Sequence, residues 1–168
     1  MNIGVYDIIN DPFPTLHRFM NISAKENEFR DDKSIVKVLN RELKMDKLDS
    51  EHIYILALTD SFYPLGILLC SVGNERRSTY NNRTAGMGLL LLGAERFSVF
   101  HNHPHGVKEI SDSDRELTKK IELMAGLFEI QFDGHIMITQ DYYDYCNVME
   151  TNEALEQLKL LAKKNKEV

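Results

Sequence analysis

The segment HNHPHGVKEISDSD at positions 101–114 constrains the fold of this chain more than any other part of the sequence. At an extended strand end, residues i and i+2 project to the same side, so His101 and His103 can converge while Asn102 faces away. A proline and a glycine then turn the chain, and Ser111 and Asp114 have the spacing of a helix start. The segment therefore predicts a strand, a turn and a helix, with the Asp114 carboxylate carried back toward the two imidazoles.

These three side chains form a candidate metal site. Two imidazole nitrogens, one carboxylate oxygen and a water would give a four-coordinate zinc site with an open position, the pattern of catalytic zinc. Simpler interpretations exist, because Ser-x-x-Asp is commonly a capping box and His-x-His a solvated loop, and each half alone is a weak signal. The two halves together are stronger, because strand ends followed by helix starts are where ligands gather in α/β sheets.

Length and composition favour one ordinary globular domain. The chain has 168 residues, of which 43% are hydrophobic and 27% charged, so disordered and fibrous classes are excluded. No apolar run approaches membrane-spanning length, and the amino terminus lacks the pattern of a secretory signal, so we expect a cytoplasmic protein without a membrane partner. The net charge of -6 disfavours nucleic acid as a partner, since tight non-specific binding needs aligned Lys and Arg.

The apolar pattern along the chain alternates between helical and strand periods, which predicts an α/β fold with a mixed sheet. Ser34 is available as the cap of the first helix. The expected helices span about 34–48, 85–94, 112–127 and 152–164, and the expected strands span 53–58, 65–72, 97–100, 128–132 and 135–139. We expect residues 1–33, with their closely spaced prolines, to form an irregular arm, residues 34–148 to form the domain, and residues 149–168 to form a C-terminal helical extension.

Two further features concern packing. The apolar stripe of Leu155, Leu158 and Leu161 in the last helix is a candidate for packing onto the domain or onto a second copy of the chain, which would make a homo-oligomer. Cys70 and Cys146 lie in apolar or aromatic surroundings and lack metal-site spacing, so two buried thiols are expected rather than a disulfide.

A hydrolytic metal site also needs a group that moves protons. Glu51 is the best candidate because it lies at the start of the first core strand. It can meet His101 if the strands 53–58 and 97–100 run antiparallel. On the residues alone, a surface carboxylate before a strand is the simpler interpretation of Glu51, and Glu95 and Glu109 are the alternatives.

The pattern HNHPxG followed by SxxD resembles the metal motif of the JAB/MPN (JAMM) metalloprotease superfamily, and its asparagine and proline are most similar to the RadC branch. Glu51 before an apolar strand resembles the upstream glutamate of the family. Gly73 and Arg83 fall where the RadC branch has a glycine and an arginine, and the run GHIMI at 134–138 resembles its Asp-His-Ile strand. The resemblance covers about residues 34–145.

The resemblance implies a single-domain α/β fold of the JAB/MPN type, a mixed β-sheet flanked by helices in a layered sandwich like that of cytidine deaminases. It implies that His101, His103 and Asp114 bind Zn2+, that Glu51 is the general acid and base, and that Ser111 donates a hydrogen bond to the forming oxyanion. Several positions depart from the RadC pattern. They are His105, Thr84, Ile110 and Gly134. None of them removes an expected zinc ligand, while His105 adds a competing imidazole, for which a solvated loop is the favoured interpretation. His135 is favoured as a strand histidine that orients a neighbour.

The expected function is that of a zinc-dependent hydrolase of amide bonds, a peptidase or isopeptidase with a peptide or protein substrate. One alternative is a DNA-associated repair-type factor or nuclease of the RadC family. The other is a metal-binding interaction module without catalysis. The substrate is set by loops and partners outside the motif.

Overall fold

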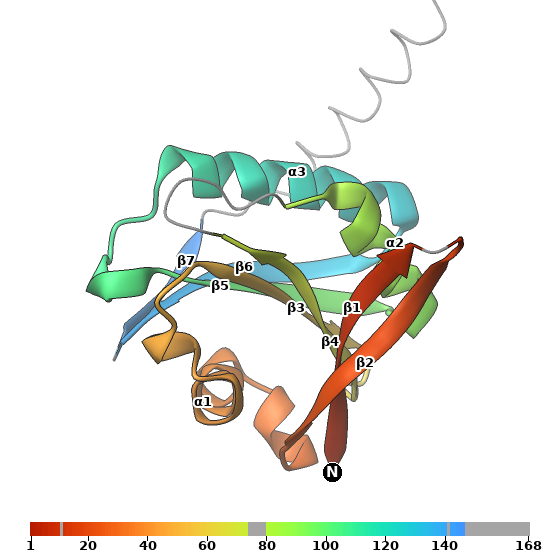
Figure 1. Ribbon diagram of the computed structural model, residues 1–168, viewed down its shortest axis with the longest axis horizontal. Coiled ribbons are helices and arrows are strands. Elements are labelled where there is room, and N and C mark those ends of the chain that lie inside the picture. Colours follow the sequence, from red (N-terminus) through yellow and green to blue (C-terminus); the bar gives the residue numbers. More distant parts are fainter. Residues whose placement is uncertain (11, 74–79, 141, 147–168) are drawn as a thin grey trace, which may run out of the picture.

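The computed structural model describes residues 1–10, 12–73, 80–140 and 142–146. Across these residues the chain forms a mixed sheet with helices on both faces, as the sequence predicts (Figure 1). Helices α2 (Asn82–Leu92) and α3 (Asp112–Phe128) cover one face, and α1 (Asp32–Leu43) covers the other. The seven strands lie in the order β2-β1-β4-β3-β5-β6-β7 and have the following bounds: β1 Asn2–Asn10, β2 Pro14–Ser23, β3 His52–Leu58, β4 Pro64–Val72, β5 Arg96–Asn102, β6 Gln131–Thr139 and β7 Tyr142–Cys146.

The pairing of β3 with β5 carries the site. The two strands are antiparallel, as predicted, and Ile53 lies opposite His101. The start of β3, where Glu51 stands, is thereby held beside the end of β5, where the two histidines follow. On its other side β5 runs parallel to β6, with His101 opposite Met137.

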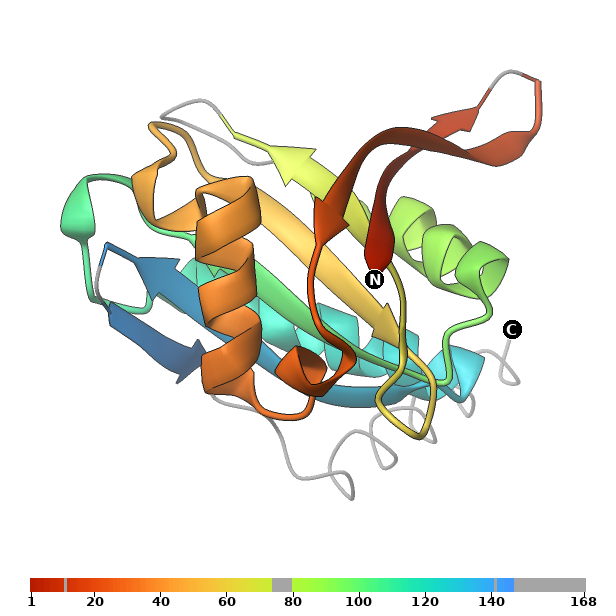
Figure 2. The same ribbon diagram turned by 90° about the horizontal axis from the view of Figure 1, so that it is seen from below.

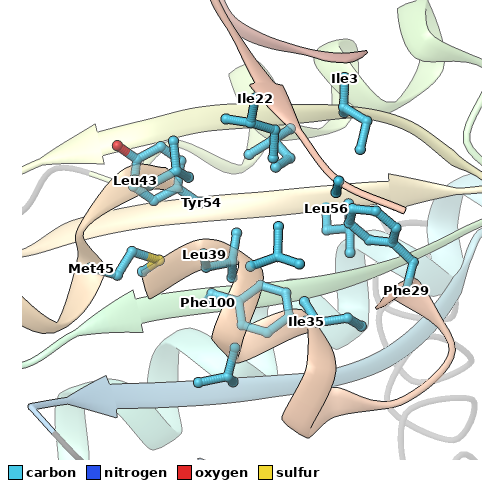
Figure 3. Packing of buried hydrophobic residues seen from close by; sticks show 14 of the residues in the cluster. Ile3, Ile22, Phe29, Ile35, Leu39, Leu43, Met45, Tyr54, Leu56 and Phe100 are labelled. Atoms are coloured by element: carbon cyan, nitrogen blue, oxygen red, sulfur yellow. The ribbon is translucent and has the colours of Figure 1, made fainter. Parts of the chain in front are cut away.

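The core consists of two clusters, one on each face of the sheet. Along β3, Tyr54, Leu56 and Leu58 belong to the cluster beneath α1, and the alternating Ile53, Ile55 and Ala57 belong to the cluster beneath α2 and α3. A strand that is buried on both faces has no need for polar alternation, which explains the continuous apolar run of 53–58. Figure 3 shows Leu39 and Ile35 of α1 packed toward Phe100 and Leu56 of the sheet.

Helix α1 begins earlier and ends earlier than predicted. Its N-cap is Asp31, whose carboxylate accepts a hydrogen bond from the Ser34 backbone N–H at 3.0 Å, so Ser34 lies inside the first turn and is not the cap. The helix ends at Leu43, because Lys44 adopts a left-handed conformation with φ of 56°. A separate 3-10 turn, Met45–Lys47, follows before the chain reaches β3.

The expectation of an irregular arm at residues 1–33 is wrong for most of that segment. Strands β1 and β2 pair as an antiparallel hairpin, and β1 also pairs in parallel with β4, where Val5 lies opposite Ile67. Figure 2 shows this hairpin extending from the sheet beside α2. The apolar pattern in the sequence of β2 is weak because β2 is an edge strand whose residues are mostly exposed. Such a strand needs few apolar side chains and takes its stability from backbone pairing.

The end of the domain also differs in detail from the prediction. Phe128 belongs to α3, and the two expected strands at 128–132 and 135–139 form the single strand β6, which contains Gly134 at φ of 151°. Strand β7 was not predicted, because its aromatic and acidic residues lack a clear apolar alternation. The expected helix at 152–164, with its apolar stripe, lies outside the described residues. No helix of the described part of the chain has the length and apolar character needed to cross a membrane.

Packing of α1 onto the sheet is testable with two leucines of opposite exposure. Leu39 is 0% exposed in α1, and Leu127 is 68% exposed in α3. Leu39→Ala should lower the free energy of unfolding by about 2–5 kcal/mol, because it removes buried methyl groups and leaves a cavity. Leu127→Ala should change it by about 0.5 kcal/mol or less. Urea unfolding followed by circular dichroism measures both, and equal effects would contradict the packing described.

Candidate metal centre

Three side chains of the predicted site converge. His101 lies near the end of β5, His103 follows that strand, and Asp114 is the third residue of α3. The two histidine Nε2 atoms are 3.0 Å apart. His101 Nε2 lies 3.5 Å from Asp114 Oδ1, and His103 Nε2 lies 3.4 Å from Asp114 Oδ2. Two nitrogens and a carboxylate therefore face one another, as the ligands of one ion would.

Backbone contacts hold His103 in line with the strand that precedes it. Its N–H donates a hydrogen bond to the carbonyl oxygen of Ile138 at 2.8 Å, and its own carbonyl accepts one from the Thr139 hydroxyl at 3.0 Å. The pairing with β6 thus continues one residue beyond β5, which keeps the i and i+2 relation between His101 and His103. A short 3-10 helix, Pro104–Gly106, then turns the chain away.

Asn102, which faces away from the two imidazoles, fixes the segment that holds Glu51. Its Oδ1 accepts a hydrogen bond from the His52 backbone N–H at 2.7 Å, and its Nδ2 donates one to the Ser50 carbonyl at 3.0 Å. The residues on both sides of Glu51 are therefore bonded to the strand end that carries the histidines. Gly73 adds a third contact, because its N–H donates to the Glu51 carbonyl at 2.7 Å.

Ser111 and Asp114 form the capping box that the sequence predicts at the start of α3. The Ser111 hydroxyl accepts a hydrogen bond from the Asp114 backbone N–H at 3.2 Å and donates one to Asp114 Oδ2 at 2.7 Å. The Ser111 backbone N–H donates to the same oxygen at 2.8 Å. The cap thus orients the carboxylate, and Oδ1 is left to face His101.

The carboxylate of Asp114 is ionised at neutral pH. Burial acts to raise the pKa of Asp114, but the hydrogen bond from His103, the electrostatic influence of the nearby His101 ring and the bonds from Ser111 outweigh it and hold the pKa well below its usual range. The hydrogen bond to Asp114 raises the pKa of His103, while burial lowers the pKa of His101. The site therefore combines a fixed negative charge with a buried neutral imidazole.

Glu51 has the opposite tendency to Asp114. Burial raises the pKa of its carboxyl group, and the negative charge of Asp114 raises it further, whereas His103 lowers it. These influences show that Glu51 lies within electrostatic range of the site. A carboxyl group whose pKa is raised toward neutrality can both accept and return a proton.

The donor set fits a divalent cation. Neutral imidazole nitrogen and carboxylate oxygen are the ligands of catalytic zinc, and three protein ligands leave a position open. The Nε2 atoms of His101 and His103 lie 3.0 Å apart beside the Asp114 carboxylate, so all three groups can reach one ion. The negative charge of Asp114 also raises the pKa of the half-buried Glu51, and a cation bound at this site would offset that repulsion.

A second group lies behind the first and was not found from the sequence. His101, His135 and Cys146 are all buried, and their ligand atoms lie within 4.8 Å of one another. Register explains the grouping, because His135 pairs with Cys146 between β6 and β7. The chain spacing of Cys146 gave no signal because β7 was not predicted. Both cysteines are free, as expected, although Cys70 is only partly buried. Burial raises the pKa of the Cys146 thiol to about 12 and lowers the pKa of His135 to about 4, so both are neutral.

The remaining candidates stay outside the site. Glu95 precedes β5, at the end of that strand opposite to His101, and accepts a hydrogen bond from the Asp60 backbone N–H at 2.7 Å. Glu109 is exposed in the loop before α3, and Arg83 is exposed near the start of α2. His105 is exposed with φ of 60° and, within the residues that the structure describes, belongs to neither metal-ligating group.

This chain is similar to a known domain family and to several known proteins. The family profile of the RadC-like JAB domain matches residues 29–152. A UPF0758 protein of Actinobacillus pleuropneumoniae serotype 5b (strain L20) is 42% identical over 74 residues, 44% of this chain and 34% of the relative. A UPF0758 protein of Finegoldia magna (strain ATCC 29328 / DSM 20472 / WAL 2508) is 27% identical over 111 residues, 66% of this chain and 49% of the relative.

The matched region thus spans a third to a half of the length of these curated relatives. The family profile match covers the strand, turn and helix that bring His101, His103 and Asp114 together. The chain belongs to the RadC-like JAB domain family.

Proposed function

We propose that this chain is a zinc-dependent hydrolase that cleaves amide bonds in peptide or protein substrates. The observation that carries the proposal is the convergence of His101 Nε2, His103 Nε2 and the Asp114 carboxylate at 3.0–3.5 Å, with Glu51 within electrostatic range. A purely structural zinc site would be closed by a fourth protein ligand. Here the fourth nearby group, Glu51, has a raised pKa, which suits proton transfer.

His101, His103 and Asp114 would hold the cation. When bound, it supplies a Lewis acid that polarises a carbonyl group and makes water acidic enough to act as a nucleophile at neutral pH. Zinc is the proposed ion because two imidazoles and one carboxylate are the ligands of catalytic zinc, although such a set also accepts other divalent ions.

Glu51 would move the proton. Its carboxylate accepts a proton from the attacking water and later returns it to the nitrogen of the leaving amine, so the group ends each cycle unchanged. The pKa of Glu51, raised by burial and by Asp114, makes its carboxylate a stronger base in the first step. Asn102 supports this role because its bonds to the backbone of Ser50 and His52 hold the chain on both sides of Glu51 beside the end of β5.

Ser111 would stabilise the developing oxyanion. Its side chain is at the exposed N-terminus of α3, and its hydroxyl donates a hydrogen bond to Asp114 Oδ2. A rotation of the hydroxyl would redirect its proton to a substrate oxygen, at the end of the helix where the partial charge is positive. The cap survives the rotation, since the backbone N–H of Ser111 still bonds Asp114.

Phosphodiester hydrolysis is the competing reaction for the same ligand set. The net charge of -6 disfavours it, because a nucleic acid substrate would meet a protein of like charge. Hydrolysis of an amide bond in a peptide does not require a positively charged protein surface.

Metal binding is the first test. The purified full chain, stripped with a chelator and titrated with Zn2+, should bind one ion per chain. His103→Ala and Asp114→Asn should weaken binding by about 100-fold or more, because each removes one of three protein ligands. Competition against a chromophoric chelator measures the affinity.

The matched control for metal binding is His105→Ala. This histidine is two residues from His103 but exposed. Its removal should leave the affinity unchanged. Equal loss in His105→Ala and His103→Ala, or a wild-type chain that binds no zinc, would contradict the proposed site.

Glu51→Gln tests the proton-transfer role. The zinc-loaded variant should bind zinc as the wild type does but lose about 10²–10⁴-fold in hydrolysis, because a glutamine cannot accept the proton. The probe is a mixture of unstructured peptides, together with a peptide branched through a lysine isopeptide bond, and mass spectrometry follows the products. Glu109→Gln, an exposed glutamate of the nearby loop, is the control. Full activity in Glu51→Gln would refute the role, and cleavage of DNA in place of the peptides would favour the competing reaction.

A further inference from the structure

A chain of short hydrogen bonds runs behind the candidate metal centre and returns to it. His101 Nδ1 lies 2.8 Å from His135 Nε2, and His135 Nδ1 lies 2.8 Å from the Thr118 hydroxyl oxygen. The Thr118 hydroxyl in turn donates a hydrogen bond to the backbone carbonyl of Asp114 at 2.7 Å. The chain therefore starts at one candidate ligand, His101, and ends at the backbone of another, Asp114.

The position of every proton in this chain follows from its last bond. A carbonyl oxygen can only accept, and a threonine hydroxyl has one proton, so that proton lies between Thr118 and Asp114. The Thr118 oxygen must then accept from His135, which places a proton on His135 Nδ1. If the ring of His135 is neutral, its Nε2 carries a lone pair and can only accept from His101.

Burial supports the neutral form of His135. Its side chain is 0% exposed, and the two groups hydrogen-bonded to its ring, Thr118 and His101, are not carboxylates. A charged imidazolium in this position would lose its hydration without a bonded anion in exchange. The proton between the two histidines therefore belongs to His101 Nδ1.

We infer that His135 and Thr118 are positioning residues that fix the tautomer of His101, so that its Nε2 lone pair faces His103 and Asp114 before any ion binds. The inference rests on the proposed metal site but concerns the protein without metal. A histidine ligand needs a free lone pair, and the hydrogen bond at its other nitrogen decides where that lone pair is. The opposite tautomer would point an N–H at the position of the ion.

The same residues suggest a competing interpretation. His101, His135 and Cys146 could hold an ion of their own, because their ligand atoms lie within 4.8 Å of one another. The proton assignment argues against it, since His101 Nδ1 carries the proton that it donates to His135 and so has no lone pair for an ion. The two interpretations differ in whether a thiolate contacts the ion.

Nuclear magnetic resonance tests the inference directly on the full chain without metal. Long-range 1H–15N correlation spectra at neutral pH distinguish the two tautomers of each histidine. Both His101 and His135 should carry the proton on Nδ1. A proton on His101 Nε2 would overturn the inference, whatever the zinc affinity of the protein.

Thr118→Val and Thr118→Ser form a matched pair for the functional consequence. Valine has nearly the shape of threonine but no hydroxyl, so His135 loses its acceptor, and zinc affinity should fall by about 10-fold to 100-fold. Serine keeps the hydroxyl and should retain the affinity of the wild type. Equal affinity in all three proteins would refute the positioning role. The wild-type spectra keep the test decisive if the valine variant does not fold.

Two further outcomes separate this inference from the proposed function. A wild-type chain with both protons on Nδ1 that nevertheless binds no zinc would support the inference and refute the proposed function. A Co2+ complex with a thiolate charge-transfer band that disappears in Cys146→Ser would locate the ion at the inner group and overturn the inference.

Discussion

The structure of the site depends on the bonds that Asn102 makes across the antiparallel pair of β3 and β5. Strand pairing brings the start of β3 to the end of β5, and the Asn102 amide then bonds to Ser50 and His52 on either side of Glu51. The side chain that points away from the imidazoles thus fixes the backbone on both sides of Glu51. Residues fifty positions apart in the chain become neighbours through one amide group.

The charged and the neutral groups of the site occupy different positions. Asp114 is ionised and partly buried, and it is held by Ser111 and the two histidines. Behind it, His135 and Thr118 are buried and neutral, and each of their polar groups has a partner. In this arrangement the negative charge of Asp114 lies beside the two candidate histidine ligands, and the oriented dipoles of His135 and Thr118 lie behind His101. Such preorganisation lowers the cost of binding a cation.

The sequence predicts the convergence of His101, His103 and Asp114 better than it predicts the boundaries of the fold. The central strands and the capping box at Asp114 follow from apolar runs and from local hydrogen bonding, both of which are short-range properties. The β1–β2 hairpin was missed because an edge strand needs little apolar surface, and β7 was missed for lack of alternation. The inner group was missed for the same reason. Cys146 meets His135 only through the register of β6 with β7, which is a long-range property of the sheet.

The central claim is that one ion binds between His101, His103 and Asp114, and the crystal structure of the zinc-loaded chain tests it most directly. Anomalous scattering at the zinc absorption edge locates the ion without assumptions about its ligands. We expect one peak, within about 2.0–2.2 Å of His101 Nε2, His103 Nε2 and an Asp114 carboxylate oxygen, with Glu51 not coordinated. A peak between His135 and Cys146, or Glu51 as a fourth protein ligand, would contradict the claim.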